Sequence, residues 1–326
     1  MTLDFLDGKS VLVTGGTGSF GKSFVNSILD ETGVRRVVVF SRDELKQYEM
    51  QQLYPGEERI RFFIGDVRDS RRLNRAFEGV DVVIHAAALK HITAAEYNPI
   101  EAVRTNIHGA ENVIDAAIDN GVERVIALST DKASSPINLY GATKLVSDKL
   151  FVAGNAYVGR RKTRMSVVRY GNVVGSRGSV VPRFQKLAES GTLPITDTRM
   201  TRFWITLAQG VRFVRDSLER MRGGEIFVPK LPSMKVVDLA AAIVPEAEIE
   251  VIGIRPGEKL HEEMISVTDA RHAVDTGNFY VVEPEMEWWP KDEPYGETLA
   301  EGFSYRSDSN DWWLSLDELK AILEEA

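Results

Sequence analysis

The chain has 326 residues, of which 43% are hydrophobic and 27% charged, a composition typical of a globular protein with a sizeable core. Its net charge of −8 and its isoelectric point near 5.4 argue against a general nucleic-acid binder. The absence of cysteine excludes disulfides, thiol nucleophiles and thiolate metal sites, and the five histidines lack the spacing of a metal site.

The sequence contains no signal for export or membrane insertion. No run of about 18 apolar residues is present. The first residues, MTLDFLDGKS, lack the basic and apolar regions of a signal peptide. We therefore expect a cytoplasmic protein with no membrane contact.

Strand and helix patterns alternate through the first half of the chain. Short apolar runs predict buried parallel strands at residues 11–13, 36–40, 60–64, 80–84, 124–128 and 165–169. Helix patterns lie between them at residues 19–29, 43–53, 100–120 and 140–156. This alternation is typical of an α/β fold with a doubly wound parallel sheet of Rossmann type.

After Tyr170 the pattern changes, because glycine, proline and aromatic residues become frequent. A helix near residues 207–221 and a strand at 225–228 return to the sheet. We expect a cofactor-binding Rossmann domain of residues 1–170 plus about 205–228. A smaller mixed lobe for substrate, with an acidic C-terminal tail, takes residues 171–204 plus 229–326. We expect the tail to pack onto the body or a neighbouring subunit, or else to act as a lid, through Trp288, Trp289, Trp312 and Trp313.

A glycine-rich turn follows the first strand. Gly15, Gly18 and Gly21 have the spacing G-x-x-G-x-x-G and lead directly into the first helix. Glycine lets the backbone turn sharply and approach a pyrophosphate, which then lies at the helix N-terminus. The turn therefore predicts a dinucleotide site.

The end of the second strand selects the cofactor. An acidic residue there would bind the ribose 2′-hydroxyl of NAD, but this chain has Ser41 and Arg42, with Lys46 one turn further on. A hydroxyl and two cations suit a 2′-phosphate and favour NADP. Asp43 is the argument for NAD, although it suits a helix cap better.

Two later strand ends complete the predicted cofactor site. Asp66 and Val67 are placed to meet the adenine, with an N-terminal helix cap as the alternative for Asp66. The small residues after the fourth strand let the backbone pass close to the cofactor. The predicted cofactor residues are Gly15, Thr17, Gly18, Ser19, Phe20, Gly21, Ser41, Arg42, Lys46, Asp66, Val67, Ala86, Ala87, Ala88, Lys90, Tyr140 and Lys144.

Two acid/base pairs follow the fifth strand. Tyr140 and Lys144 lie four apart and share one helix face, and a neighbouring ammonium favours the phenolate of a tyrosine. Asp131 and Lys132 lie just upstream, at the end of the strand. The sequence therefore predicts one site with two sets of proton-transfer groups, with a strand-end ion pair as the alternative for Asp131 and Lys132.

Together these features resemble the extended short-chain dehydrogenase/reductases, through the glycine turn, His85-Ala86-Ala87-Ala88, Asn106, Ser129-Thr130 and Tyr140-x-x-x-Lys144. Longer runs over residues 8–282 are similar to the inverting UDP-N-acetylglucosamine 4,6-dehydratases: S-R-D-E-L-K, H-A-A-A-L-K-H, S-T-D-K-A-S-S-P-I-N-L-Y-G-A-T-K, R-Y-G-N-V-V-G-S-R-G-S-V-V-P and R-P-G-E-K-L-H-E. Retaining relatives generally have methionine at the position of Tyr140, and dTDP-glucose dehydratases have Asp-Glu in place of Asp131-Lys132.

The resemblance implies an NADP-dependent lyase for the first step of pseudaminic acid synthesis. Tyr140, activated by Lys144, removes the O4 proton while the C4 hydride moves to the cofactor. Lys132, if desolvation makes its neutral form accessible, takes the C5 proton, and Asp131 helps protonate the departing C6 hydroxyl. The hydride then returns to C6 and a proton reaches C5 from the other face. Which of Asp131 and Lys132 performs which proton transfer stays open.

Further residues are assigned to the nucleotide sugar. Guanidinium groups suit a diphosphate, and a Y-G-N run contacts the sugar nucleotide in the family. The predicted substrate residues are Lys90, Ser129, Thr130, Asn172, Thr196, Arg202, Arg255 and Glu258. His91 and His261 are expected to be structural or peripheral.

Two other functions stay open. A UDP-sugar 4-epimerase would use Tyr140 and Lys144 but leave Asp131 and Lys132 without a role. A non-catalytic NADP-sensing regulator could dispense with the tyrosine-lysine pair, which this chain keeps. The helices at 100–120 and 140–156 are those through which short-chain dehydrogenases commonly pair, so we expect a homo-oligomer, as a dimer or a hexamer.

Overall fold

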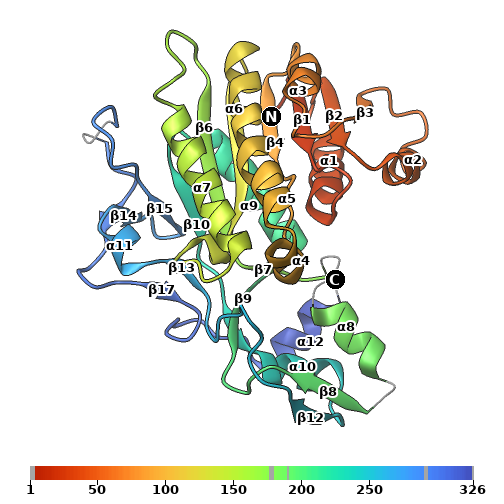
Figure 1. Cartoon of the computed structure of the whole chain (residues 1–326), viewed down its shortest axis with the longest axis vertical. Helices are drawn as coiled ribbons and strands as arrows, with labels where there is room; N and C mark the ends of the chain where they lie inside the picture. The colour runs from red at the N-terminus through yellow and green to blue at the C-terminus, as the bar shows by residue number, and fades with distance from the viewer. Residues whose placement is uncertain (1–3, 176–179, 189–190, 290–292, 325–326) are drawn as a thin grey trace.

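The computed structural model describes residues 4–175, 180–188, 191–289 and 293–324 (Figure 1). Within these residues the centre is a ten-stranded sheet in the order β16-β14-β15-β10-β6-β5-β4-β1-β2-β3. Neighbours from β10 to β3 are parallel, which confirms the predicted α/β fold. These parallel strands are β1 (Ser10–Thr14), β2 (Arg36–Ser41), β3 (Ile60–Ile64), β4 (Val82–His85), β5 (Arg124–Thr130), β6 (Arg164–Tyr170) and β10 (Ile226–Pro229).

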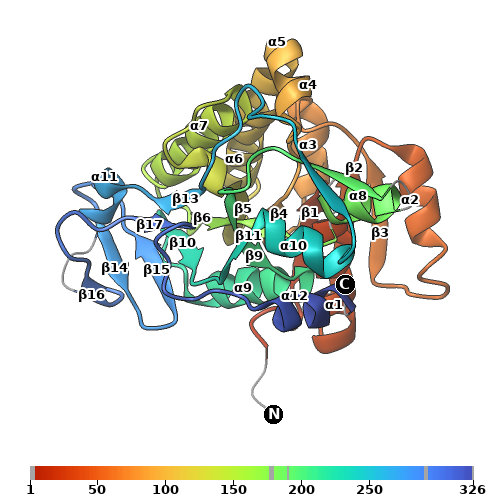
Figure 2. The same cartoon turned by 90° about the horizontal axis from the view of Figure 1, so that it is seen from below.

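Helices cover both faces of the sheet (Figure 2). On one face α1 (Ser19–Glu31) packs against α9 (Leu207–Arg220). On the other, α6 (Gly109–Asp119) lies between α3 (Ser70–Phe77) and α7 (Leu139–Gly154). The shorter helices of this half are α2 (Glu44–Gln51), α4 (Ile92–Tyr97) and α5 (Pro99–Val103).

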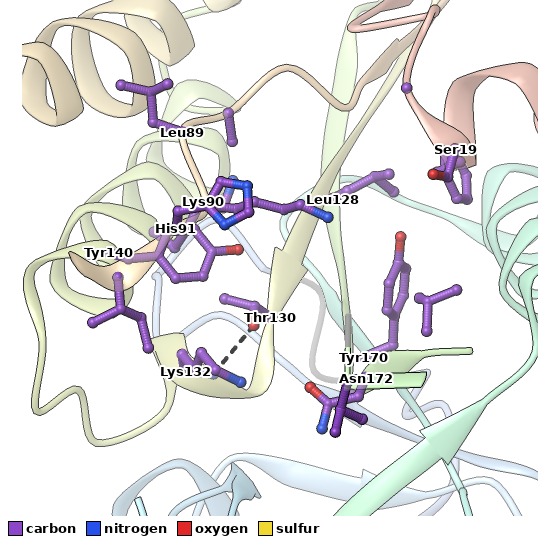
Figure 3. Close-up of a pocket in the computed structure, with 18 of the residues that line it drawn as sticks. Ser19, Leu89, Lys90, His91, Leu128, Thr130, Lys132, Tyr140, Tyr170 and Asn172 are labelled. Carbon is purple, nitrogen blue, oxygen red and sulfur yellow. Dashed lines mark hydrogen bonds between the residues drawn. The ribbon is translucent and has the colours of Figure 1, made fainter. Parts of the chain in front are cut away.

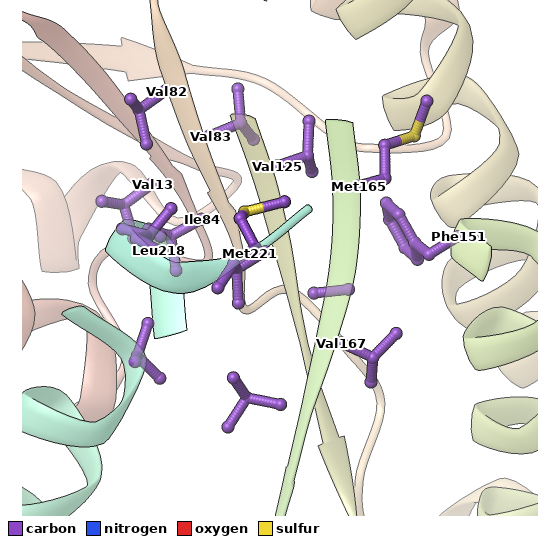
Figure 4. Close-up of a cluster of buried hydrophobic side chains, with 14 of the residues drawn as sticks. Val13, Val82, Val83, Ile84, Val125, Phe151, Met165, Val167, Leu218 and Met221 are labelled. Atoms are coloured by element: carbon purple, nitrogen blue, oxygen red, sulfur yellow. The ribbon is translucent and has the colours of Figure 1, made fainter. Parts of the chain in front are cut away.

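The main core lies between the sheet and these helices (Figure 4). Strand side chains meet Phe151 of α7 on one side and Leu218 of α9 on the other. The β-branched residues of the strands suit a pleated surface that is buried on both faces. The strand members of this cluster include Val13, Val82, Val83, Ile84, Val125 and Val167.

The long helix predicted at residues 100–120 is interrupted by a π-helical turn. The chain runs from α5 into η1 (Arg104–His108) and then into α6. Single π-turns inside α-helices occur frequently at functional sites. Here the turn carries Asn106, which is buried and bonded to the loop after β4, so the irregularity lies beside the predicted site.

The smaller lobe lies at the carboxyl end of the sheet (Figure 1). It contains two small sheets, one in the order β11-β9-β7 and one that pairs β12 with β8. Its elements are β7 (Asn172–Val173), α8 (Val180–Leu187), β8 (Thr192–Ile195), β9 (Thr201–Ile205), β11 (Ser233–Lys235), α10 (Val236–Ile243), β12 (Glu248–Val251) and, from the tail, α12 (Leu316–Glu324). Leu314 and Leu319 of the tail pack with Trp204 and Leu239 in a core of this lobe.

The main sheet crosses the predicted domain boundary. Strand β15 (Phe279–Val282) pairs antiparallel with β10, and β14 (Ala273–Asp275) and β16 (Glu297–Thr298) extend the sheet beyond it. Beside them, β13 (Glu263–Ile265) pairs with β17 (Tyr305–Arg306), and α11 is Val267–Ala270. The division into two domains stays a prediction, and β14, β15 and β16 continue the cofactor-domain sheet.

No helix among the described residues is long and apolar enough to cross a membrane. In the same part of the chain, no group of three or more histidine, aspartate or glutamate side chains is arranged to hold a metal ion. The run R-Y-G-N-V-V-G-S-R-G-S-V-V-P, noted in the sequence, lies partly outside the described residues, at 176–179.

Candidate active site

A cavity of about 940 Å³ opens at the carboxyl ends of the parallel strands and is lined by both the main sheet and the smaller lobe. This edge is where open α/β sheets bind their ligands. All predicted cofactor and substrate residues line the cavity, with the exception of Asp66. Of the four predicted catalytic residues, Lys132, Tyr140 and Lys144 line it and Asp131 does not.

The glycine turn has the shape that a pyrophosphate requires. Gly15 has φ +67°, and a Cβ there would lie 2.9 Å from the backbone nitrogen of Ala87. A Cβ on Gly21 would lie 2.5 Å from the Cα of Gly16, so the turn can pack this closely only with glycine. Gly18 begins α1 without a side-chain cap, and the helix N-terminus therefore faces the cavity uncapped. The turn fits a dinucleotide.

The end of β2 presents the predicted polar group to the cavity. The hydroxyl of Ser41 accepts a hydrogen bond from Gln47 Nε2 at 3.1 Å. The Arg42 side chain is 53% exposed, and its Nη1 lies 3.8 Å from Asp66 Oδ2. Asp43 accepts a hydrogen bond from the backbone N–H of Lys46 at 3.0 Å, which confirms it as the cap of α2.

Asp66 differs from the prediction. It does not line the cavity, and its carboxylate accepts hydrogen bonds from the backbone N–H of Arg68 at 3.0 Å and from its guanidinium at 2.7 Å. Burial opposes ionisation, but the bonds and charge of Arg68 lower the pKa of Asp66. The helix-cap alternative is also wrong, because Asp69 caps α3. Its neighbour Val67 does line the cavity.

Asn106 fixes the small-residue loop after β4. Its side-chain oxygen accepts from the N–H of Leu89 at 2.8 Å, and its Nδ2 donates to the Leu89 carbonyl at 2.9 Å and to Thr143 Oγ1 at 3.0 Å. The π-turn thereby ties this loop to α7. Lys90 follows in the same loop and reaches the cavity, where burial lowers its pKa (Figure 3).

Tyr140 and Lys144 lie in the first turns of α7, which Asn138 caps by accepting from the N–H of Gly141 at 2.8 Å. Burial raises the pKa of Tyr140 to about 12, against the charge of Lys132 and a hydrogen bond with Thr130. The positive charge of Lys132 therefore favours the phenolate of Tyr140, an effect that the sequence assigned to Lys144. Burial lowers the pKa of Lys144, against the charge of Asp148.

Lys132 lies between two buried carboxylates. Its Nζ lies 3.0 Å from Asp131 Oδ1 and 3.0 Å from Glu262 Oε1. Arg202 Nε lies 3.7 Å from the same oxygen of Glu262, and the Thr130 hydroxyl donates to Asp131 Oδ1 at 2.8 Å. These five groups, from three separate parts of the chain, are joined by ion pairs and hydrogen bonds into a cluster that we call the Lys132 cluster.

The electrostatics of the Lys132 cluster correct one expectation. Burial opposes the charge on Lys132, but the two carboxylates outweigh it and raise the Lys132 pKa. Burial and Glu262 together raise the pKa of Asp131. The sequence assumed that desolvation would make neutral Lys132 accessible, whereas its partners stabilise the ammonium and favour a proton on Asp131.

Asp131 also lies behind the cavity wall. Its side chain is 1% exposed, whereas that of Lys132 is 19% exposed. Figure 3 shows Lys132 and the Tyr140 hydroxyl directed into the same hollow, with Tyr170 and Asn172 across from them. Lys132 is therefore the member of the predicted pair that can touch a ligand in this arrangement.

The predicted phosphate residues lie on the lobe side of the cavity. Arg202 is 8% exposed, and its guanidinium donates to the carbonyl oxygens of Lys259 and Leu260, at 3.0 and 3.1 Å. Arg255 is half-exposed and pairs with Glu258 at 2.9 Å. Burial opposes the negative charge on Glu258, but the ion pair with Arg255 and a hydrogen bond with Thr196 outweigh burial and lower the pKa of Glu258.

Ser129, His91 and His261 contact neighbouring parts of the protein around the site. The Ser129 hydroxyl donates to Asp148 Oδ2 at 2.7 Å, and Arg169 Nη2 lies 3.3 Å from that oxygen. His261 Nδ1 lies 2.8 Å from Thr201 Oγ1, and His91 begins α4 at the cavity wall.

Glu262 is the functional group that the sequence reasoning missed. It ends the run R-P-G-E-K-L-H-E, which was noted, but only Arg255 and Glu258 were selected from that run. The contact of Glu262 with Lys132 joins segments far apart in the chain, so residue spacing could not reveal it. Tyr170 and Lys259 also line the cavity and were not selected.

Comparisons with known proteins agree with this architecture. A model of the polysaccharide biosynthesis protein family matches residues 11–284. The UDP-N-acetylglucosamine 4,6-dehydratase (inverting) of Campylobacter jejuni is 55% identical over 97% of both chains. The UDP-glucose 4-epimerase of Rickettsia canadensis is 38% identical over 98% of this chain and 96% of its own.

Solved structures show the same fold. Pen from Bacillus thuringiensis has 37% identity and a TM-score of 0.90 over 98% of both chains. DesIV, a dTDP-glucose 4,6-dehydratase from Streptomyces venezuelae with NAD and TYD bound, has 27% identity and a TM-score of 0.69. That match covers 77% of this chain and 86% of the DesIV chain.

Proposed function

This chain belongs to the polysaccharide biosynthesis protein family, and we propose that it acts on UDP-N-acetylglucosamine as an inverting 4,6-dehydratase. The product is UDP-2-acetamido-2,6-dideoxy-β-L-arabino-hex-4-ulose, in the first step of pseudaminic acid synthesis. The observation that carries the proposal is the Lys132 cluster beside Tyr140 in one cavity. Oxidation alone needs one proton acceptor, whereas elimination of water needs a second group that exchanges protons.

The chain's own residues divide the proton transfers between them. Tyr140 removes the proton from O4, favoured as phenolate by the positive charge of Lys132. Lys132 faces the cavity, so we assign to it the removal of the C5 proton, once it has passed its own proton to Asp131, and the transfer of that proton to the C6 hydroxyl, which leaves as water. Asp131 and Glu262 hold Lys132 in place, and a proton that reaches C5 from the opposite face of the sugar inverts that centre. With a nicotinamide dinucleotide bound, hydride leaves C4 and returns at C6.

We propose NADP as the dinucleotide. A nicotinamide cofactor fits the glycine turn, and Arg42 and Lys46 line the cavity where a 2′-phosphate would lie. The variant Arg42→Ala is expected to weaken NADP binding about tenfold, the scale of one lost charge-assisted contact, and to leave NAD binding nearly unchanged. Calorimetric titration with both dinucleotides measures the ratio, and equal losses for the two would contradict the proposal.

A 4-epimerase is the second candidate, because the Rickettsia relative carries that name and covers nearly the whole chain. Epimerisation needs Tyr140 but gives the Lys132 cluster no work. The mass of the product separates the two reactions, since dehydration removes one water and epimerisation removes nothing.

The deuterium content of the product tests the dehydratase most directly. The enzyme is incubated with UDP-N-acetylglucosamine and NADP in deuterated water. We expect a 4-keto-6-deoxy product that carries deuterium at C5 with inverted configuration. A product of unchanged mass apart from exchange at hydroxyl groups would sink the proposal.

We also propose that the protein forms a homo-oligomer, as a dimer or hexamer, in the cytoplasm. Apolar side chains on α4, α5 and α7 support self-association, since Tyr97 is 88%, Ile100 59% and Val146 40% exposed. Light scattering coupled to size exclusion measures the assembly, and a monomer at micromolar concentration would contradict it. Cell fractionation tests the location.

A further inference from the structure

We infer that Glu262 is a positioning residue of the proposed dehydratase site: with Asp131 it holds the Lys132 ammonium between two carboxylates, and its negative charge keeps a proton on the Asp131–Lys132 pair. The inference rests on the proposed function and adds a group that acts through Lys132. Glu262 is not assigned contact with the reacting atoms.

The backbone around Glu262 is fixed, so its carboxylate has a defined place. The N–H of Glu262 donates to the Ser307 hydroxyl at 2.9 Å, and the N–H of Ser307 donates to the Glu262 carbonyl at 2.9 Å. The guanidinium of Arg202 binds the carbonyls of Lys259 and Leu260 just before it. A rigid backbone on both sides aims the side chain at Lys132.

Both carboxylates of the Lys132 cluster are satisfied on one oxygen and unsatisfied on the other. Asp131 Oδ2 and Glu262 Oε2 are buried without a hydrogen-bond partner among the described residues. Ionising both of these buried carboxylates costs free energy, because so few hydrogen-bond donors compensate for the loss of water. The geometry therefore favours a shared proton in the cluster, and Lys132 connects that proton to the cavity.

The charges facing the Asp131–Lys132 pair come from every neighbouring segment. Tyr140 lies on α7, Arg202 on β9, Lys259 in the loop before β13 and Glu262 immediately before that strand. Glu262 is the acidic member of this set that touches Lys132. Removing its charge leaves less negative charge beside Arg202 and Lys259 and drives protons off the pair.

The sign of the effect follows from Coulomb's law. A carboxylate close to the Asp131–Lys132 pair raises the pH at which the pair releases each of its two protons. Activity requires one proton on the pair, so the acidic and alkaline limbs of the rate profile both report it. Without the charge of Glu262 both limbs move to lower pH.

The test compares wild type with Glu262→Gln, Glu262→Asp and Glu263→Gln. In Glu262→Gln we expect kcat to fall at least about tenfold and both limbs to move down by about one pH unit or more. Glu262→Asp keeps the charge on a shorter side chain and should restore the limbs even with a reduced kcat. Glu263→Gln is the matched control, because its carboxylate binds Ser134 and Ser135 and not Lys132.

A second measurement does not need turnover. Carbon NMR of protein labelled at aspartate carboxyls follows the titration of Asp131, which should occur at lower pH in Glu262→Gln than in wild type. Unmoved limbs together with an unmoved Asp131 titration would overturn the inference, even if kcat fell. If wild type forms no dehydrated product, the proposed function fails, and the Asp131 titration still decides the role of Glu262.

Discussion

Lys132 and Lys144 line the same cavity, and burial opposes the charge on both. Lys132 forms ion pairs with Asp131 and Glu262 at 3.0 Å, and its pKa is raised. Lys144 has no ion pair among the described residues, and its pKa is lowered despite the charge of Asp148. Partners, more than depth, set the protonation of these two lysines.

The difference in ion pairing between Lys132 and Lys144 suits two different roles in the proposed reaction. Lys132 can exchange a proton with Asp131 and Glu262, because its Nζ lies within hydrogen-bond distance of both carboxylates. It can therefore accept a proton from a ligand in the cavity or donate one to it. We propose that Lys144, one turn after Tyr140 on α7 and without a carboxylate contact among the described residues, acts instead as a positive charge in the cavity. We assign elimination to Lys132 and support of C4 oxidation to Lys144.

Removing Lys132 breaks the comparison most completely. We expect Lys132→Met to lose dehydration by about a thousandfold or more, because it removes the side chain to which we assign the proton transfers at C5 and at the C6 hydroxyl. The change leaves Asp131 and Glu262 facing each other without their cation, so thermal unfolding is measured alongside product formation. A folded variant that retains near wild-type dehydration would remove Lys132 from the mechanism.

A matched variant, Lys144→Met, removes the other lysine. It should also abolish product, but through failure of C4 oxidation. Product formation alone cannot separate the two variants, because both would lack product. A measurement of C4 oxidation is needed to show which step each variant blocks.

Neutralising Asp148 sharpens the comparison from the Lys144 side. Asp148→Asn removes the charge that opposes the lowered pKa of Lys144, so that pKa falls further and the alkaline limb of the first step, C4 oxidation, moves to lower pH. We expect a loss of about tenfold in kcat at neutral pH. Rapid mixing at several pH values follows C4 oxidation through the absorbance of the reduced nicotinamide, and steady-state rates measure kcat.

Asp269→Asn is the control for this variant. Asp269 is the second carboxylate on Arg169, at 3.1 Å, but it is not among the charges that act on Lys144. It should leave the alkaline limb in place. An equal displacement in both variants would mean that the Arg169 network acts through structure alone.

The smallest expected effect concerns stability at alkaline pH. The folded pKa of Tyr140, about 12, lies above the value near 10 of an unfolded tyrosine, so its contribution is full below about pH 10 and is lost between about 10 and 12. Tyr140→Phe should therefore show a shallower fall of the free energy of unfolding in that window. Urea unfolding at several pH values compares the two slopes, and identical slopes would contradict the assignment.

The cofactor half of the site could be predicted because its signals are local. The glycine turn, the Asp43 cap and the Tyr140–Lys144 spacing each lie within one loop or helix, where sequence spacing fixes geometry. The parallel sheet followed from buried apolar runs in the same way.

The Lys132 cluster could be predicted only in part. Asp131 and Lys132 are neighbours in sequence, but Arg202 joins the cluster from β9 and Glu262 from the segment before β13. Contacts between distant segments decide the direction in which the pKa of a buried group shifts, which is why the sequence could not show that Glu262 helps to raise the pKa of Lys132. The ion pairs of Asp66 with Arg68 and Arg42 could likewise not be predicted from residue spacing, and its contact with the adenine stays a prediction.

The division of labour between the two lysines is tested most directly by the first step of the reaction in each variant. Each variant, Lys132→Met and Lys144→Met, is loaded with NADP and mixed rapidly with UDP-N-acetylglucosamine at about pH 9. The alkaline pH favours the phenolate of Tyr140 and so compensates for the missing positive charge of Lys132. We predict that the absorbance of the reduced nicotinamide appears with Lys132→Met, without dehydrated product, and does not appear with Lys144→Met. Dehydrated product from Lys132→Met, or reduced nicotinamide from Lys144→Met alone, would contradict the account.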